Sequence, residues 1–363
     1  MAQRIRTPRI TRFTRMHHDG AMAIGILTSG GDCPGLNAVI RAVVLKGTTV
    51  YGREFVGFTD GFRGLNNGDA VPLVRSDIQG IGKLGGTILG TSRSNPFENG
   101  DDQAERARAT MERLGVESLI VIGGEGTLAA ANRLGALGVK VVGVPKTIDN
   151  DLSATDYTFG FDTAVGIATD AMDRLRTTGQ SHMRCMVAEV MGRHVGWIAL
   201  HSGVAAGAHA ILIPEQRTSM EQLTNWVQSA YDRGRSPLVV VAEGYIPEGT
   251  EDAFSDLGLD TFGRPRLGGI GDIVTREIEA RTGIETRNTT LGHIQRGGTP
   301  SAYDRVLATR YGLAAIDAVV HERWGRMVSL RGTEVTHVSI DDALGKLNTV
   351  PQARYDEASI LFG

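Results

Sequence analysis

The stretch from Val139 to Asp151 constrains the possible fold more than any other part of the chain. Its first half, Val139 to Val144, is largely apolar, which is typical of a parallel strand buried on both faces. Such strands belong to α/β folds, in which helices cover both faces of the sheet. Ligands bind beyond the carboxyl ends of these strands, where Pro145 leads into Asp149 and Asp151. The stretch therefore predicts a doubly wound sheet and makes Asp149 the candidate general base.

Two other segments show the order of strand, glycine-rich loop and helix. In the first, an apolar run from Ala23 to Leu27 precedes the loop Gly30–Asn37, and in the second, Glu117–Ile122 precedes Gly123–Leu128. Backbone N–H groups in such loops, together with a helix N-terminus, favour an anion. The first loop has neither Walker A nor G-x-G-x-x-G spacing, and a glycine turn after a strand is often purely structural. Together the two loops favour phosphate binding.

Several charged residues fit the same chemistry. Glu125 lies where a carboxylate could hold Mg²⁺, although an acidic residue also suits the first turn of a helix for electrostatic reasons alone. Arg93 follows a glycine-rich segment and offers a bidentate fork to oxyanions. Phosphoryl transfer needs positioning, charge neutralisation and a base for the acceptor hydroxyl. Serine nucleophiles in a G-x-S-x-G elbow and histidines at metal-ligand spacing are absent from the sequence.

Composition narrows the class of protein. The 363 residues, 41% hydrophobic and 22% charged, suit a globular protein with a core divided between two domains. No apolar run approaches the roughly 20 residues that span a bilayer, and a net charge of −3 does not favour nucleic acid. The two cysteines, Cys33 and Cys185, are far apart, so we expect no disulfide or zinc site and a cytoplasmic location. The arginine-rich residues 1–21 are expected to be a disordered extension, with Met22 a plausible start.

Six motifs, in order along the chain, resemble those of the 6-phosphofructokinases, and most closely the actinobacterial branch that contains both ATP-dependent and pyrophosphate-dependent enzymes. The matching segments are Gly30–Asn37, Gly124–Thr127, Pro145–Asp151, Met191–Arg193, Ala242–Gly244 and Leu291–Gly298. This resemblance implies Mg²⁺ as cofactor and transfer of a phosphoryl group to the 1-hydroxyl of fructose 6-phosphate. It also implies two α/β domains, each a doubly wound sheet, facing each other across a cleft.

The resemblance assigns roles to individual residues. The catalytic set would be Asp149, Arg93, Gly31 and Asp151. The phosphoryl donor would contact Gly31, Arg93, Ser94, Gly124, Glu125, Gly126 and Thr127. Glu125 would serve the Mg²⁺ where the family usually has aspartate. Fructose 6-phosphate would contact Thr147, Ile148, Asp149, Met191, Gly192, Arg193, Glu243, His293, Ile294, Gln295 and Arg296. Arg184 and Arg287 match positions that reach the substrate of a neighbouring subunit, which implies a homodimer or homotetramer with shared sites.

Donor choice depends on Gly126 and Lys146. Pyrophosphate-dependent relatives tend to carry an aspartate at the first position, which fills the space of the ATP α-phosphate, and a lysine at the second. This chain has the ATP-type glycine and the pyrophosphate-type lysine. We expect ATP, because glycine leaves volume for the nucleotide whereas a lysine side chain can move aside. The alternatives are pyrophosphate as donor, another kinase with a G-G-[DE]-G-T loop, or a non-catalytic subunit.

The domains of this family are discontinuous in sequence. We therefore expect residues 22–160 and 295–345 to form the donor domain, and residues 161–294 and 346–363 to form the fructose 6-phosphate domain.

Overall fold

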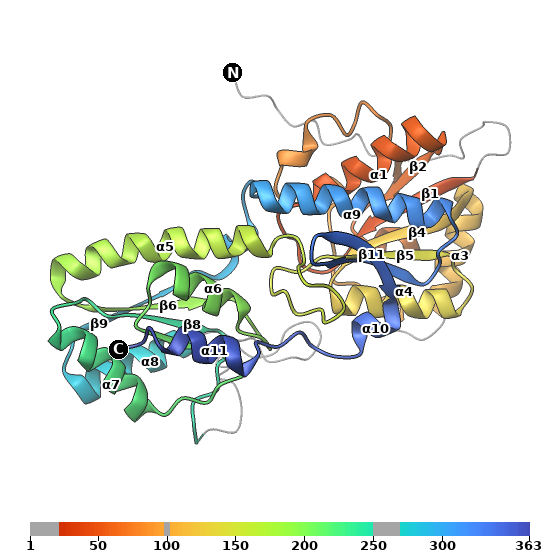
Figure 1. Ribbon diagram of the computed structural model, residues 1–363. Helices are drawn as coiled ribbons and strands as arrows, with labels where there is room; N and C mark the ends of the chain where they lie inside the picture. The colour runs from red at the N-terminus through yellow and green to blue at the C-terminus, as the bar shows by residue number, and fades with distance from the viewer. Residues whose placement is uncertain (1–21, 98–101, 250–268) are drawn as a thin grey trace. The chain divides into compact units, whose positions relative to one another are not determined.

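The computed structural model of the protein describes residues 22–97, 102–249 and 269–363, and its chain divides into two compact units (Figure 1). The first unit contains residues up to Ile148, residues Leu152–Gly160 and residues Arg296–Lys346. The second contains Asp149–Asp151, Phe161–Gln295 and Leu347–Gly363. The sequence analysis placed the boundaries at 160/161, 294/295 and 345/346, and it did not foresee that residues 149–151 group with the second unit. The extension at residues 1–21 lies outside the described residues.

The sheet of the first unit has seven strands in the order β11-β10-β5-β4-β1-β2-β3. The strands β10 (Arg326–Arg331), β5 (Val141–Pro145), β4 (Val116–Gly123), β1 (Ala23–Thr28) and β2 (Phe55–Phe58) are parallel. The edge strands β3 (Ala70–Pro72) and β11 (Glu334–Ser339) are antiparallel to their neighbours. Every residue of β1 and β5 is buried, as the sequence predicts for strands covered on both faces.

Helices cover both faces of this sheet. α1 (Leu36–Tyr51) and α9 (Ala302–Val320) lie side by side on one face (Figure 1). On the other face, one hydrophobic core joins the sheet to α2 (Phe62–Asn67), α3 (Asp102–Leu114), α4 (Glu125–Ala136) and α10 (Ile340–Leu344). A 3₁₀ turn, η1 (Ile81–Lys83), packs against α1. This arrangement confirms the doubly wound α/β class.

The second unit has a four-stranded parallel sheet in the order β7-β8-β6-β9. Its strands are β6 (Cys185–Val190), β7 (Ala210–Leu212), β8 (Leu238–Ala242) and β9 (Thr286–Thr290). The helices α7 (Met220–Asp232) and α8 (Ile270–Thr282) share a core with one face. The helices α5 (Phe161–His182) and α6 (Trp197–Ala206) pack together and against strands of the sheet. A 3₁₀ turn, η2 (Gly292–Arg296), follows β9, and α11 (Gln352–Ser359) lies near the C-terminus.

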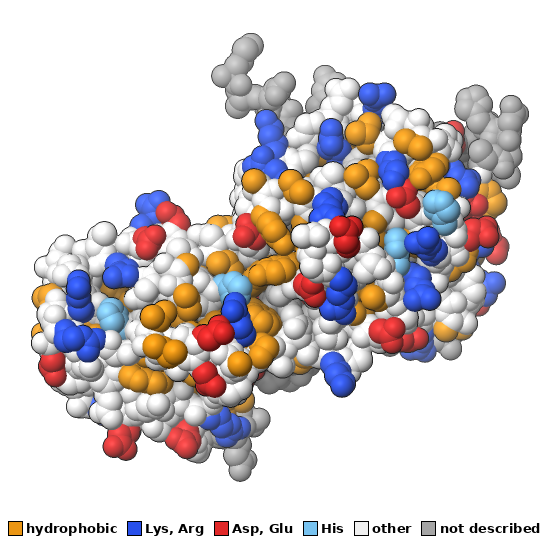
Figure 2. Space-filling model, viewed as in Figure 1, with side chains coloured by type: hydrophobic (Ala, Val, Ile, Leu, Met, Phe, Trp, Pro, Cys, Tyr) orange, Lys and Arg blue, Asp and Glu red, His pale blue; other side chains and the backbone are white. Residues whose placement is uncertain are grey.

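The described surface mixes charges of both signs. On the face shown in Figure 2, basic and acidic side chains alternate over both units rather than gathering by sign. Of the helices in the described ranges, none combines the length and apolarity that a membrane crossing requires.

Candidate active site

The loops that carry the predicted donor residues emerge from one edge of the first unit's sheet. Thr28 at the end of β1 pairs with Ile122 of β4, and Gly123 at the end of β4 pairs with Pro145 at the end of β5. Three neighbouring parallel strands therefore end at the same level. Their glycine loops and the polar segment after Pro145 begin side by side, which is where an open α/β sheet binds ligands.

The segment with Arg93 and Ser94 is fastened to the first glycine loop. The backbone N–H of Gly30 donates to the carbonyl of Ser92 at 2.9 Å, and Thr91 Oγ1 donates to the carbonyl of Gly30 at 2.7 Å. Because these bonds hold Thr91 and Ser92 against Gly30, the chain enters Arg93 and Ser94 next to the first glycine loop. The Arg93 side chain is exposed, whereas Ser94 is half-buried.

Asn37 fixes the glycine-rich segment before Arg93. Its side chain is 1% exposed, and its Nδ2 lies 3.1–3.2 Å from the carbonyl oxygens of Leu84, Gly85 and Gly86. Its Oδ1 accepts the N–H of Ile88 at 2.8 Å. The Asn37 amide provides hydrogen-bond partners for backbone groups of the loop that lie outside any strand or helix. Asn37 therefore fixes the shape of this loop.

Two cationic side chains converge on Gly31. Lys146 is 5% exposed, and its Nζ donates to the carbonyl of Gly31. A Cβ at position 31 would lie only 2.7 Å from Nη1 of Arg296, so a larger residue there would displace the guanidinium. The sequence analysis treated Lys146 as a side chain that can move aside, and in the structure it is hydrogen-bonded to the Gly31 carbonyl. The Arg296 guanidinium lies against the donor loop of the first unit, and its contact with fructose 6-phosphate stays a prediction.

Cys33, in the same loop, is not a nucleophile. The side chain is fully buried, and its thiol donates to the carbonyl of Phe159 at 3.6 Å. Burial, more than any nearby charge, raises the pKa of the Cys33 thiol far above its ordinary value. A buried thiol that stays protonated is a poor nucleophile.

The second glycine loop presents the N-terminus of α4. Glu125 and Gly126 occupy its first turn and are exposed, whereas Thr127 is 8% exposed. Thr127 Oγ1 would lie 3.2 Å from a Cβ at Gly30, so the two glycine loops are in contact here. A Cβ at Gly126 would meet nothing within 4 Å. The helix N-terminus therefore has open space in front of it and favours an anionic ligand.

The segment with the candidate base is an irregular loop. Its ends are joined because Lys146 forms a bridge with Phe159, and Thr158 Oγ1 donates to the carbonyl of Thr147 at 2.7 Å. The side chains of Asp149 and Asp151 are half-buried, and that of Ile148 is only 4% exposed.

The second unit gathers the predicted sugar-binding loops in the same way. Val190 at the end of β6 pairs with Ala242 at the end of β8, and Glu189 pairs with Thr290 at the end of β9. The N–H of Gly244 donates to the carbonyl of Gly192 at 3.1 Å. A Cβ at Gly244 would lie 1.9 Å from the carbonyl oxygen of Arg193, which only glycine permits. Met191–Arg193, Glu243 and the η2 turn therefore emerge at one edge.

Within this cluster, residues differ in exposure. His293 and Ile294 are exposed, Arg193 and Glu243 are half-buried, and Met191 is 7% exposed. Gln295 is fully buried: its Nε2 donates to the carbonyl of Gly292 at 3.0 Å, and its Oε1 accepts the N–H of Met191 at 3.3 Å. Gln295 therefore joins the η2 turn to the segment that follows β6, and its contact with the sugar stays a prediction.

Replacing Gln295 by leucine should destabilise the protein. The change keeps the volume but leaves the Gly292 carbonyl and the Met191 N–H without their partner, which costs about 1–3 kcal/mol of unfolding free energy. Denaturant unfolding of Gln295→Leu, compared with Gln222→Leu at an exposed position of α7, measures this. An equal midpoint for both variants would show that Gln295 does not hold the loops.

Glu189 fixes the start of α8. The side chain is 1% exposed, and its carboxylate accepts the N–H of Gly271 at 2.8 Å and the N–H of Gly269 at 3.2 Å. Burial raises the pKa of Glu189, and the two backbone N–H groups oppose that rise. Because its own carbonyl accepts the N–H of Leu291 at 2.9 Å, Glu189 connects the helix start to the residue before η2.

Arg184 and Arg287 meet at one carboxylate. Nε of Arg184 lies 2.7 Å from Glu285, and Arg287 forms an ion pair with the other oxygen of the same side chain. The hydrogen bond from Arg184 is the main reason why the pKa of Glu285 is lowered. The two arginines predicted to reach a neighbouring subunit therefore lie together, with one acid between them.

Sequence reasoning gave no role to several residues that shape these loops. Asn348 donates its N–H to the carbonyl of Asp151 and its Nδ2 to the carbonyl of Asn150, both at 2.9 Å. Nε1 of Trp197 donates to the carbonyl of Asn348 at 2.6 Å. No local pattern marks Asn348, because its partners lie about half a chain away.

Comparison with known proteins agrees with this arrangement. The family model for phosphofructokinase matches residues 23–319. A pyrophosphate–fructose 6-phosphate 1-phosphotransferase of Streptomyces coelicolor is 57% identical over 94% of this chain and 100% of its own length. ATP-dependent 6-phosphofructokinase 3 of the same organism is 53% identical over 93% of this chain and 99% of its own. The structure of Pichia pastoris phosphofructokinase has a TM-score of 0.81 and 31% identity, covering 96% of this chain and 38% of that one. With a family model and full-length relatives in agreement, this chain belongs to the phosphofructokinase family.

Proposed function

We propose that the protein transfers the γ-phosphoryl group of ATP to the 1-hydroxyl of fructose 6-phosphate, giving fructose 1,6-bisphosphate in glycolysis. Family membership supports the reaction class. The choice of ATP rests on one observation, the open space in front of Gly126 at the N-terminus of α4.

The first unit supplies the groups that bind the donor phosphates. The glycine loops bring backbone close to a ligand, and the α4 N-terminus favours anionic oxygens. Lys146 and Arg296, which both contact Gly31, place positive charge beside the loop where the transferred group would bind. Positioned charge of this kind is the main source of catalysis in phosphoryl transfer.

Mg²⁺ fits Glu125 as a single carboxylate rather than a protein cage. In residues 22–97, 102–249 and 269–363, no group of three or more His, Cys, Asp or Glu is placed to hold a metal ion. Mg²⁺ in kinases is bound by one or two carboxylates plus the substrate phosphates. Glu125 is exposed on the first turn of α4 and can supply one such carboxylate. When bound, the ion neutralises charge on the donor phosphates.

Asp149 is proposed to take the proton of the sugar hydroxyl, with Asp151 as its supporting carboxylate. Thr147 and Ile148 would contribute backbone to the sugar. Met191, Gly192, Arg193, Glu243, His293 and Ile294 would form the sugar-phosphate pocket of the second unit. Gly31 and Arg93 would contact the transferred phosphoryl group.

Donor choice follows from Gly126 and Lys146 together. A nucleotide needs room for its α-phosphate, and the missing side chain at Gly126 leaves that room. Lys146 is buried against the Gly31 carbonyl, so its charge remains beside the loop with either donor. Lys146 is therefore compatible with ATP while it stays bonded to Gly31.

Pyrophosphate is the second candidate donor. The S. coelicolor relative named for pyrophosphate is 57% identical to this chain, against 53% for the relative named for ATP. These values are too close to decide between donors, and the space at Gly126 favours the larger one.

A direct comparison of donors tests the proposal. We expect kcat/KM with MgATP to exceed that with pyrophosphate by at least about tenfold, because binding contacts of the nucleotide are used only by ATP. Initial rates of fructose 1,6-bisphosphate formation at fixed fructose 6-phosphate and Mg²⁺ provide the measurement. A higher value with pyrophosphate would establish the second candidate, and no product with either donor would refute phosphofructokinase activity.

We also propose a cytoplasmic homodimer or homotetramer with shared substrate sites. The two free, buried cysteines fit a reducing compartment, and the Arg184–Glu285–Arg287 cluster offers net positive charge to a neighbour's sugar phosphate. Neither nucleic acid nor membrane is proposed as a partner.

A further inference from the structure

The loop that carries Asp149 needs support from elsewhere in the chain. Residues 147–158 form no helix or strand, so the loop itself supplies little rigidity. A general base must be held within a fraction of an ångström of its productive position. The contacts that hold this loop therefore bear on the rate of the reaction.

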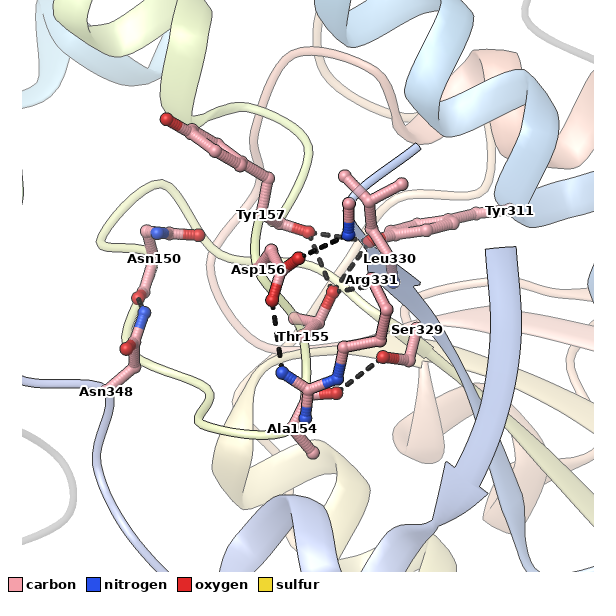
Figure 3. A network of polar contacts seen from close by, with 11 residues as sticks. Asn150, Ala154, Thr155, Asp156, Tyr157, Tyr311, Ser329, Leu330, Arg331 and Asn348 are labelled. Carbon is pink, nitrogen blue, oxygen red and sulfur yellow. Dashed lines mark hydrogen bonds and ion pairs between the residues drawn. The ribbon is translucent and has the colours of Figure 1, made fainter. Parts of the chain in front are cut away.

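In the first unit, backbone and side chains of β10 hold residues 154–156 (Figure 3). The N–H of Asp156 donates to the carbonyl of Leu330, and the N–H of Leu330 donates to Thr155 Oγ1, both at 2.9 Å. Ser329 Oγ donates to the carbonyl of Ala154, and Arg331 pairs with Asp156 at 3.1 Å. The loop is thus joined to a strand of the central sheet although it is not part of that sheet.

Tyr311 of α9 completes this attachment. Its hydroxyl donates to the carbonyl of Tyr157 at 2.6 Å and lies 2.8 Å from Thr155 Oγ1 (Figure 3). Thr155 Oγ1 donates to the carbonyl of Tyr157 at 3.0 Å and accepts the N–H of Leu330, so the two hydroxyls converge on the Tyr157 carbonyl. Burial raises the pKa of the Tyr311 phenol, so it keeps the proton that it donates.

The Tyr311 ring also connects the closed end of the Asp149 loop, at Phe159, to the first glycine loop. It packs edge-on against Phe159 with centroids 6.4 Å apart, and a Cβ at Gly35 would lie 2.7 Å from the Phe159 ring. Phe159 forms the bridge that closes the loop with Lys146. The Tyr311 hydroxyl therefore holds residues 155–157 of the loop, and the Tyr311 ring packs against Phe159, where the loop is closed.

In the second unit, Asn348 holds the residues next to Asp149. Asn150 is 4% exposed and has a φ of 54°, a left-handed conformation that costs free energy for a residue other than glycine. Asn348 donates to the carbonyls of Asn150 and Asp151, and Trp197 in turn holds the Asn348 carbonyl. These bonds fix the left-handed turn that immediately follows the candidate base.

We propose that Tyr311 and Asn348, which lie outside the motif, are positioning residues that fix the loop and hence the carboxylate of Asp149. This inference rests on the proposed role of Asp149 as the base. Neither residue is proposed to touch a substrate.

The test compares two tyrosine variants that each lose one buried hydroxyl. Tyr311→Phe should lower kcat about tenfold while KM for each substrate stays within about twofold, because the loop that Tyr311 fixes carries the base, whereas most of the groups proposed to bind the substrates lie on other loops. Tyr355→Phe is the matched control, since Tyr355 is buried and its hydroxyl donates to the carbonyl of Ile211 at 2.9 Å. Its kcat should equal that of the wild type.

Further variants separate positioning from general destabilisation. Thr155→Val and Asn348→Ala should lower kcat as Tyr311→Phe does, whereas Thr155→Ser, which keeps the hydroxyl, should restore it. Amide hydrogen exchange of residues 149–157 should be faster in Tyr311→Phe and unchanged in Tyr355→Phe. This readout does not depend on activity.

Two results would overturn the inference, and they differ from a failure of the proposed function. Wild-type kcat in Tyr311→Phe and Asn348→Ala, beside lost turnover in Asp149→Ser, would show that the base acts without these anchors. Equal losses of kcat in Tyr311→Phe and Tyr355→Phe would show a general stability effect. If Asp149→Ser remained active, the base assignment itself would be wrong, and the inference would fall with it.

Discussion

Replacing Asp149 by serine should reduce kcat by about 10²–10⁴-fold, the range that loss of a general base produces. The serine removes the carboxylate that accepts the proton of the sugar hydroxyl but leaves the proposed pocket residues Arg193, Glu243 and His293 unchanged. KM for fructose 6-phosphate should therefore stay within about threefold of the wild-type value. Initial rates over a range of sugar concentrations separate the two parameters.

The control for this variant is an exposed carboxylate with an ordinary role. Asp170 lies on α5, where it pairs with Arg174 one helical turn away at 3.0 Å. Asp170→Ser should cost a few tenths of a kcal/mol of stability and leave kcat unchanged. Turnover of Asp149→Ser within about tenfold of the wild type would assign the proton transfer to another group.

Local sequence pattern predicted the strands that position the site because burial on both faces leaves a distinct signal. The apolar runs at Ala23–Leu27 and Val139–Val144 correspond to β1 and β5, with ends that differ by at most two residues. The hairpin of β10 and β11 was not predicted. Its sequences, RMVSLR and EVTHVS, alternate weakly. The edge strand β11 has no buried residue, and β10 has only four buried residues between two exposed arginines, so neither leaves a distinct signal.

The supporting contacts could not be predicted, because they join residues that are distant in sequence. Gln295 and Met191 are separated by 104 positions, Tyr311 and Tyr157 by 154, and Asn348 and Asn150 by 198. The motifs identified the residues that are expected to meet the substrates. Which side chains hold those residues depends on tertiary packing, so no sequence signal marked the role of the buried Gln295 in joining two segments.

Gly126→Asp should change the donor without harming the fold. Position 126 lies in the first turn of α4, where an aspartate is favourable against the helix dipole and replaces a glycine that costs helix stability. Open space around the position means that the new side chain meets no neighbour. The free energy of unfolding should therefore stay equal or rise by about 0.3–1 kcal/mol.

The same substitution should reduce kcat/KM for ATP about 100-fold. Its carboxylate would occupy the space proposed for the α-phosphate, and such a contact between like charges costs several kcal/mol. A 100-fold loss corresponds to about 2.7 kcal/mol, which is within that cost. Pyrophosphate has no third phosphate, so its use should be kept or should increase relative to ATP. Rates with both donors, together with thermal unfolding, provide the measurement.

Gly126→Ala separates charge and bulk from any requirement of the backbone. Its methyl group would enter the space in which nothing lies within 4 Å, so ATP use should stay within about threefold of the wild type. A loss of ATP use in the alanine variant as large as that in the aspartate variant would mean that the loop needs glycine for another reason. Unchanged ATP use in Gly126→Asp would show that the α-phosphate does not bind there. Other residues would then have to select the donor, and Lys146, which is bonded to Gly31, would be the next residue to replace.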